Sequence, residues 1–173
     1  SGFMEPITFI LKDAGYMDKF PQGVIDIISY EGEVYSIPVN IHRSNVMWYS
    51  PKLFKQFNLQ PPKTMDDFFR VAEVFKSNGI PALALGDNEI WAATHLLESV
   101  ILAHTGADKY NALWEGKVQW NDSQIRSALN AFAKMMGYIN RDHAALANMD
   151  AAGYVAEGKA AMNVMGDWAA GYY

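Results

Sequence analysis

Three groups of side chains in this sequence bring hydrogen-bonding groups together with flat aromatic rings. One is the turn Gly166-Asp167-Trp168, and another is Trp91, which follows the loop at residues 86–88. A carboxylate accepts two hydrogen bonds at once, and an indole offers a flat apolar surface. The third group is a polar patch with amide, imidazole, guanidinium and hydroxyl groups: Asn40, His42, Arg43, Ser44 and Asn45.

The polar patch lies between two runs of residues typical of β-strands, 34–41 and 46–49. Pro38 cannot donate a ladder hydrogen bond, so the first run belongs to a sheet edge or ends there. One interpretation is a chain that crosses between two bodies or lines a cleft. The other is a polar loop between two edge strands, or a hinge network of hydrogen bonds that touches no ligand.

The turn also has two interpretations. Asp167 and Trp168 follow a run predicted to be a buried strand, 160–165, and Gly166 lets the backbone come close to a bound molecule. Alternatively, Asp167 only caps the next helix and Trp168 packs in the core. Trp91 opens a helix and is open to the same alternative of simple packing. His95, one turn later, is expected to be a hydrogen-bonded histidine of the helix face.

The elements that must position these residues alternate along the chain. Gly and Pro residues between segments, N-cap residues and hydrophobic periodicity predict the order of helices and strands along the chain. The N-cap of the helix that ends before Gly79 is Thr64, and Asn121 or Asp122 caps a later one. The interleaving predicts an α/β fold. The predicted helices are 6–13, 21–28, 52–57, 65–78, 91–103, 122–139 and 151–157, and the predicted strands are 80–85, 160–165 and a hairpin around Glu31-Gly32.

Composition excludes several function classes. The 173 residues carry a net charge of −5 and contain no cysteine. The lack of a Lys/Arg cluster disfavours a nucleic-acid partner, and no apolar run is long enough to span a membrane. The four histidines are too scattered for a zinc site, and no nucleotide-binding or hydrolase motif occurs. We therefore expect neither a cofactor nor a metal, and no enzyme activity.

Three segments in the same order resemble a known family. They are Ser-Ile-Pro-Val-Asn-Ile-His-Arg-Ser-Asn-Val-Met-Trp-Tyr (36–49), Phe-Asn-Leu-Gln-Pro-Pro-Lys-Thr-Met-Asp-Asp-Phe (57–68) and Gly-Lys-Ala-Ala-Met-Asn-Val-Met-Gly-Asp-Trp-Ala (158–169). The sequence resembles the extracellular solute-binding proteins of carbohydrate ABC transporters, and among them the glucose-binding branch.

The resemblance implies a periplasmic-binding-protein type II clamshell, of which this chain would be mostly the second lobe. Residues 1–38 would be the tail of the first lobe and the hinge approach, and residues 39–173 an incomplete second lobe. Proteins of this family are longer at both ends, so the chain is expected to be an internal fragment. We expect such a fragment to bind sugar weakly or not at all, and to expose an apolar patch, where the missing segments would pack, that favours self-association.

The implied function is to bind glucose or a similar monosaccharide in an interlobe cleft and deliver it to the membrane permease of an ABC importer. The implied location is periplasmic or extracellular, with a lipid anchor as an option in the full-length protein. Ala92 stands where the glucose-binding branch has a polar amide, which leaves the identity of the sugar open. The residues expected to contact the ligand are Asp167, Trp168 and Gly166, then Asn40, His42 and Arg43, and then Trp91.

Two alternatives remain at this point. A glycoside hydrolase fragment also combines aromatic residues with carboxylates, and it needs two carboxyl groups across one bond. Asp87, Glu89 or Glu98 would then pair with Asp167. A structural or interaction domain, in contrast, would show no saturable response to a small ligand.

Overall fold

The computed structural model describes residues 3–173, and these divide into two compact units between residues 41 and 42. The first unit ends at Ile41, three residues beyond the predicted boundary at residue 38. The assignment of the units to two lobes of a clamshell stays a prediction. Among the described residues, no helix combines the length and hydropathy that crossing a membrane requires.

The first unit is small. Its elements are α1 (Thr8–Asp13), α2 (Gln22–Ile27), β1 (Ser29–Tyr30) and β2 (Glu33–Val34). The two strands pair antiparallel with Ser29 opposite Val34, so the predicted hairpin is confirmed. Leu11, Ile25 and Val34 form its buried core. The Thr8 hydroxyl accepts a hydrogen bond from the Val34 N–H at 2.8 Å and ties α1 to the hairpin.

The first extended run was predicted as strand to residue 41, and this is wrong beyond Val34. No strand is assigned between β2 and β3 in this described stretch of chain. The Tyr35 N–H still donates to Ile28 at 3.0 Å, which closes the hairpin. Beyond it, Pro38 lacks an N–H, and a β-rich composition alone cannot supply a pairing partner.

The second unit contains a three-stranded sheet in the order β3-β5-β4. Its strands are β3 (Val46–Tyr49), β4 (Leu83–Ala84) and β5 (Met162–Met165). β3 runs antiparallel to β5, with Val46 opposite Met165, whereas β4 runs parallel to β5. The central strand β5 is almost wholly buried. A parallel pair needs a long crossover, and helices supply it here, so the α/β class is confirmed.

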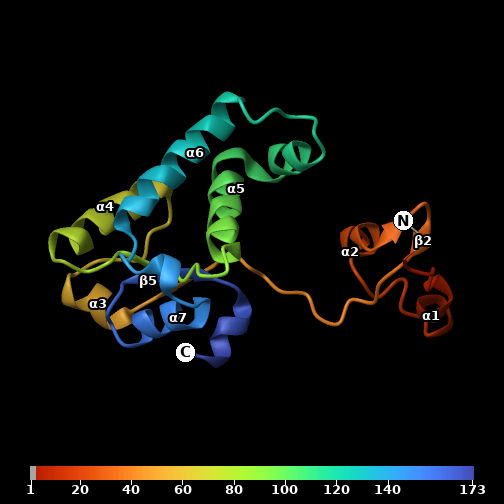
Figure 1. Ribbon diagram of the computed structural model, residues 1–173, viewed down its shortest axis with the longest axis horizontal. Helices are drawn as coiled ribbons and strands as arrows, with labels where there is room; N and C mark the ends of the chain where they lie inside the picture. The colour runs from red at the N-terminus through yellow and green to blue at the C-terminus, as the bar shows by residue number, and fades with distance from the viewer. Residues whose placement is uncertain (1–2) are drawn as a thin grey trace. The chain divides into compact units, whose positions relative to one another are not determined.

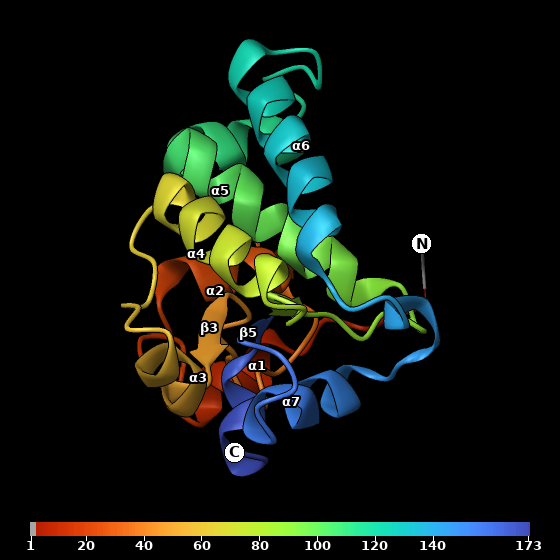
Figure 2. The same cartoon turned by 90° about the vertical axis from the view of Figure 1, so that its left-hand side faces the viewer.

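Helices cover this sheet on both sides. Figures 1 and 2 show α4, α5 and α6 on one side and α7 on the other. The largest core cluster joins the long helices to the sheet through Phe75, Ile101, Ile125 and Met162. The helices are α3 (Pro51–Gln56), α4 (Met65–Ser77), α5 (Trp91–Trp114), α6 (Ser123–Met135) and α7 (Asn148–Ala156), with short 3₁₀ helices η1 (Met136–Tyr138), η2 (His143–Ala145) and η3 (Asp167–Gly171).

The predicted caps are confirmed, but two helix ends differ from the prediction. The Thr64 hydroxyl accepts from the Asp67 N–H, and the Asp122 carboxylate accepts from two N–H groups of α6. α5 continues to Trp114 past a break at Gly106, where φ is 73°. A glycine changes direction at little steric cost, so it bends this helix pair instead of ending it. α6 stops at Met135 and passes into η1.

Candidate ligand site

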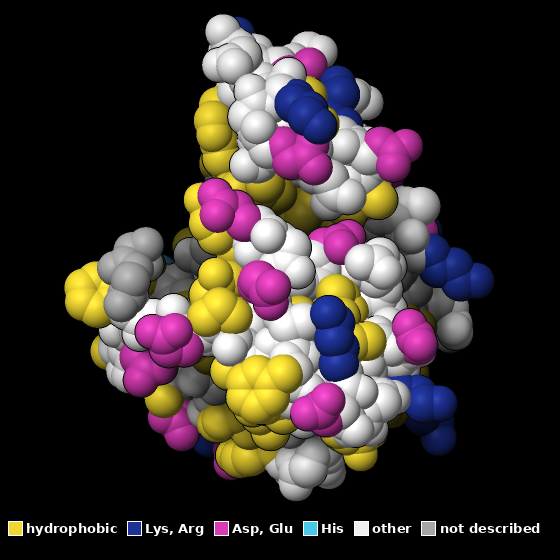
Figure 3. Space-filling view, turned by 90° about the vertical axis from the view of Figure 1, so that its right-hand side faces the viewer, with side chains coloured by type: hydrophobic (Ala, Val, Ile, Leu, Met, Phe, Trp, Pro, Cys, Tyr) yellow, Lys and Arg dark blue, Asp and Glu magenta, His cyan; other side chains and the backbone are white. Residues whose placement is uncertain are grey.

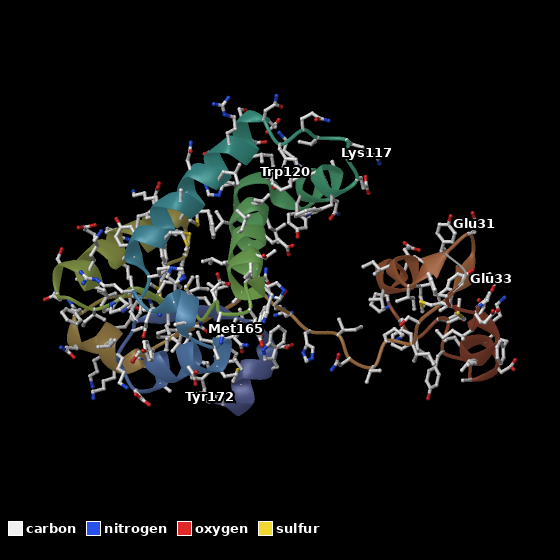
Figure 4. The ribbon with its side chains drawn as sticks, in the orientation of Figure 1. Glu31, Glu33, Lys117, Trp120, Met165 and Tyr172 are labelled. Atoms are coloured by element: carbon white, nitrogen blue, oxygen red, sulfur yellow. The ribbon has the colours of Figure 1, made fainter. Side chains whose placement is uncertain are left out.

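Three loops meet at one edge of the sheet because of its strand directions. β4 and β5 are parallel, so the segments that follow them, 85–90 and 166–168, leave at the same edge. β3 is antiparallel to β5, so its first residue, Val46, lies opposite Met165 at that edge. Met165, labelled in Figure 4, marks the point where the turn begins. Residues 42–45 therefore reach the turn Gly166-Asp167-Trp168.

Asp167 is held by the segment that precedes β3. Its N–H donates to the Arg43 carbonyl at 2.9 Å, and its Oδ2 accepts from the Arg43 N–H at 3.2 Å. Its Oδ1 lies 2.7 Å from His42 Nδ1. The His42 hydrogen bond, followed by that of the Arg43 backbone, lowers the pKa of Asp167 below its ordinary value of 3.8.

The lowered pKa keeps the Asp167 carboxylate ionised at neutral pH. An ionised carboxylate only accepts, so His42 Nδ1 carries the hydrogen of their bond. The Asp167 side chain is 46% exposed, and each oxygen accepts one bond and keeps a further lone pair. The site therefore presents an oriented acceptor to solvent.

Trp168 turns back over Gly166. A Cβ atom on Gly166 would collide with the six-membered ring of Trp168, so only glycine fits at this position. The His42 ring meets Trp168 edge-on, with ring centroids 5.0 Å apart and planes at 82°. Trp168 is half-buried, and it packs against a small buried cluster formed by Leu85, Ala92, Met165 and Ala169.

Trp91 reaches the same place from the start of α5. Its ring centroid lies 6.2 Å from that of Trp168, with the planes at 53°. Its Nε1–H donates to Glu89 Oε2 at 3.0 Å, which orients the indole. Asp87 accepts from the Ala93 N–H at 3.0 Å and caps the helix. Ile90, between them, has a left-handed backbone with φ 70°.

His95 joins this aromatic group one turn further along α5. Its ring centroid lies 5.0 Å from Trp91 and 6.4 Å from Trp168. The Nδ1 atom is buried and has no hydrogen-bond partner. The expectation of a hydrogen-bonded helix-face histidine is therefore wrong.

The structure brings most of the predicted residues together. Asn40 lies in the first unit, where its side chain is exposed, and its role stays a prediction. Contact of any of these residues with a ligand is likewise still a prediction. The residues that lie at one edge of the second unit are His42, Arg43, Trp91, Gly166, Asp167 and Trp168.

The predicted ligand contacts do not include two members of this group: Glu89, which was considered only as a hydrolase carboxylate, and His95, which was interpreted as a helix-face histidine. The i, i+4 spacing of Trp91 and His95 places them on one helix face, so it carried the signal for His95. Nothing in the spacing of Glu89 and Trp91 indicates their hydrogen bond. It depends on the turn at Ile90, whose left-handed backbone is unusual for a β-branched residue.

The carboxylates near the site are engaged in ways that do not fit glycoside hydrolysis. Asp87 caps α5, Glu89 binds the Trp91 indole, and Glu98 contacts Tyr110, whose pKa is raised by burial and by this carboxylate. No cluster that could hold a metal ion occurs among the residues described. The arrangement offers the Asp167 acceptor, held by the His42 side chain and the Arg43 backbone, beside the rings of Trp91 and Trp168.

A separate hollow of about 690 Å³ lies between β3, α4 and α5. Its wall is mainly apolar, with Met47, Phe68 and Val100 among its residues, and Asn45 is the member of the polar patch that reaches it. None of the seven residues predicted to contact a ligand lines it. The sheet edge, rather than this hollow, combines the groups that the sequence singled out.

Comparison with known proteins decides the family. The profile of a family described as bacterial extracellular solute-binding protein matches residues 1–173. The chain belongs to this family. The predicted relationship is thus confirmed for the whole length of the sequence.

Related sequences within this family come from bacteria and archaea. An ABC transporter extracellular-binding protein of Pyrococcus horikoshii is 39% identical over 157 residues, covering 90% of this chain and 36% of the relative. A probable sugar-binding periplasmic protein of Mesorhizobium japonicum is 27% identical, and the match covers 100% of this chain and 42% of the relative. The glucose-binding protein GlcS of Saccharolobus solfataricus is 22% identical, and the match covers 96% of this chain and 31% of the relative.

Solved structures of solute-binding proteins share the fold. A chitin oligosaccharide binding protein superposes with a TM-score of 0.83 at 24% identity, covering 96% of this chain and 42% of the other. The solute receptor AcbH gives a TM-score of 0.82 at 21% identity, covering 95% and 42%. At these identities the likeness shows the fold, which is the predicted periplasmic-binding-protein type.

The chain spans about two fifths of the length of the relatives it matches, 36% and 42% for the first two. These relatives and structural neighbours are solute-binding proteins and not enzymes, so the prediction of a non-enzymatic family is confirmed. Their names place them outside the cytoplasm, as extracellular or periplasmic proteins, in line with the predicted location.

Proposed function

We propose that this chain is the ligand-binding part of a sugar-binding protein that serves an ABC importer, and that its ligand is glucose or a similar monosaccharide. The observation that carries the proposal is the Asp167 carboxylate, held by His42 and Arg43 beside Trp168 and Trp91. An ionised, oriented acceptor next to aromatic rings is the combination that a sugar requires.

The chemistry of a sugar ring explains this requirement. Hydroxyl groups line its equator, and C–H groups form an apolar face that packs on an indole. The half-exposed Asp167 carboxylate has lone pairs left on both oxygens to accept hydrogen bonds from neighbouring hydroxyls of a sugar. The Arg43 side chain is exposed in the same segment and supplies donors for hydroxyl oxygens. A carboxylate at this position also disfavours acidic sugars.

The names of several relatives favour a sugar ligand, and GlcS favours glucose in particular. AcbH is described as preferring a galactopyranose, so a related monosaccharide is the next candidate. In the proposed mechanism the ligand has greater affinity for a closed state of two lobes and shifts the equilibrium toward it. The closed form would then be recognised by the membrane permease.

The test is calorimetric titration of the natural protein that carries this sequence with glucose, galactose, mannose, maltose and cellobiose. We expect saturable binding of one monosaccharide and at least a tenfold loss of affinity in Asp167→Ala, because a charge-assisted hydrogen bond contributes roughly 1.5–3 kcal/mol. Asp108→Ala is the matched control, since Asp108 is an exposed carboxylate beyond the Gly106 break in α5. This chain alone is expected to bind the sugar only weakly.

Two outcomes would count against the proposal. If the protein is folded and no sugar gives a binding heat, the function would instead be binding of another solute or a structural role. Binding that Asp167→Ala leaves unchanged would keep the ligand class but move the site elsewhere.

A further inference from the structure

His95, whose ring packs with those of Trp91 and Trp168, carries an unexplained polar atom. Three buried side-chain atoms in the described part of the chain lack a hydrogen-bond partner: His95 Nδ1, His143 Nδ1 and Asn163 Oδ1. Asn163 lies within the sheet on β5, and His143 begins η2. His95 is the member of this set whose ring packs against both Trp91 and Trp168.

A buried imidazole nitrogen without a hydrogen-bond partner is unusual in a folded protein. A buried polar atom that loses water without gaining a partner costs free energy, and natural structures rarely keep one without a reason. His104, a second histidine on α5, has a partner for the same atom: its Nδ1 lies 2.9 Å from the Val100 carbonyl one turn earlier. His95 has no such bond to its own preceding turn, although it lies on the same helix.

We propose that His95 is a further sugar-contacting residue, whose Nδ1 receives its missing hydrogen bond from a hydroxyl of the bound ligand. The inference rests on the function proposed above. A hydroxyl both donates and accepts, so it satisfies either tautomer of a neutral imidazole, which a carboxylate or an ammonium group does not. This property favours a neutral hydroxylated ring as the ligand.

The neighbouring indoles explain how the atom becomes accessible. Trp91 and Trp168 meet at 53° with centroids 6.2 Å apart, which is contact distance and leaves no room for a sugar between the rings. In the proposed complex the sugar packs on one indole and moves it away from the other, and this movement uncovers the His95 ring, which packs against both. Trp91 is restrained by its hydrogen bond to Glu89.

The proposal predicts a characteristic split between stability and binding. His95→Phe keeps a flat ring and removes the orphan nitrogen, so the sugar-free protein should unfold at an equal or higher temperature. The same variant should bind the sugar at least tenfold more weakly, because a hydroxyl loses its partner. His95→Asn places an amide near the Nδ1 position and should restore affinity to within about threefold of the wild type.

The experiment measures thermal midpoints and sugar titrations of the natural protein carrying these substitutions. His143→Phe is the matched control: it removes the same kind of orphan atom outside the aromatic group and should leave sugar affinity unchanged. A second measurement needs no variant, since the ¹⁵N resonance of His95 Nδ1 should move when glucose saturates the wild-type protein and that of His143 should not.

The outcomes separate this inference from the proposed function. A wild-type protein that binds no sugar overturns the proposed function and this inference with it. Sugar binding that His95→Phe leaves intact, or a His95 resonance that does not move although calorimetry shows that glucose is bound, overturns the role of His95 alone. An equal loss of affinity in His143→Phe would also overturn it, because the effect would then not be local to the site.

Discussion

At the scale of single residues, the site depends on close approaches that few side chains tolerate. Asp167 is fixed by His42 and by two backbone bonds with Arg43, so its carboxylate is oriented before any ligand arrives. Such preorganisation lowers the entropy that binding must overcome. Trp168 depends equally on the absence of a side chain at Gly166.

The pH dependence of stability should reveal the Asp167 hydrogen bonds. Its folded pKa is lowered below 3.8, so these bonds stabilise the protein above that pH and are lost as the pH falls through the folded pKa. The difference in thermal midpoint between wild type and Asp167→Asn should therefore be larger at about pH 5 than at about pH 2.5. A difference that stays constant over this range would contradict the assignment.

Gly166→Ala should damage the site through a steric clash. The new Cβ would collide with the Trp168 ring, so we expect a loss of about 1–3 kcal/mol in the free energy of unfolding. Urea denaturation measures this loss. Gly171→Ala is the control within the same 3₁₀ helix, because no atom lies within 4 Å of its added Cβ. Equal stability of the two variants would show that Trp168 moves aside freely.

At the scale of elements, the candidate site is formed by the segments that meet at one edge of the sheet and by the loop before α5. Gly86 lets this loop approach the Ala147 backbone, since a Cβ there would collide with the Ala147 carbonyl. Asp87 caps α5 and thereby fixes the first turn that carries Trp91. The loop reaches the helix through Ile90, whose left-handed backbone is unfavourable for a β-branched residue.

Ile90→Gly should stabilise the second unit. Glycine adopts a positive φ without steric cost, and the Ile90 side chain is 73% exposed, so little packing is lost. We expect a gain of roughly 1 kcal/mol in the free energy of unfolding. Ile90→Ala is the control, because alanine keeps most of the backbone cost. A gain as large in Ile90→Ala would mean that removal of the exposed side chain is responsible.

At the scale of the whole molecule, the two units differ in the size of their cores. Of the four hydrophobic clusters found among residues 3–173, three lie in the second unit, whereas the first unit buries Leu11, Ile25 and Val34. Small chains bury too little apolar surface to offset their conformational entropy. The second unit is therefore the part expected to be stable by itself.

This difference in stability can be tested by expressing the two units separately. Residues 42–173 should unfold in one cooperative transition, at a thermal midpoint close to that of the whole chain. Residues 1–41 alone should show the circular dichroism of an unfolded peptide. A folded first unit, or a second unit without a transition, would contradict this division of stability.

Self-association is a second property of the whole molecule. Large hydrophobic side chains of the first unit are strongly exposed, with Phe3 at 93%, Ile27 at 86% and Val39 at 93%. Figure 3 shows hydrophobic side chains at the surface among acidic and basic ones. Exposed apolar surface of this kind favours association, so the mass measured by light scattering should rise with concentration. A constant monomer mass at high concentration would contradict the prediction.

Local signals in the sequence determined a large part of this protein. Thr64 and Asp122 mark helix starts through their own hydrogen bonds, and the hairpin at Glu31-Gly32 needs only its turn residues. The motifs at 36–49 and 158–169 also indicated the family and most of the site residues. These features depend on neighbouring residues or on shared ancestry, both of which a sequence records directly.

The tertiary structure alone decided how those residues meet. The extended run after Val34 found no strand partner, and α5 bent at Gly106 and continued. The bond between His42 and Asp167 joins positions 125 residues apart, and the strand order β3-β5-β4 brings them to one edge. Strand pairing and burial depend on residues distant in the chain, and for this reason the orphan nitrogen of His95 became visible only in the folded protein.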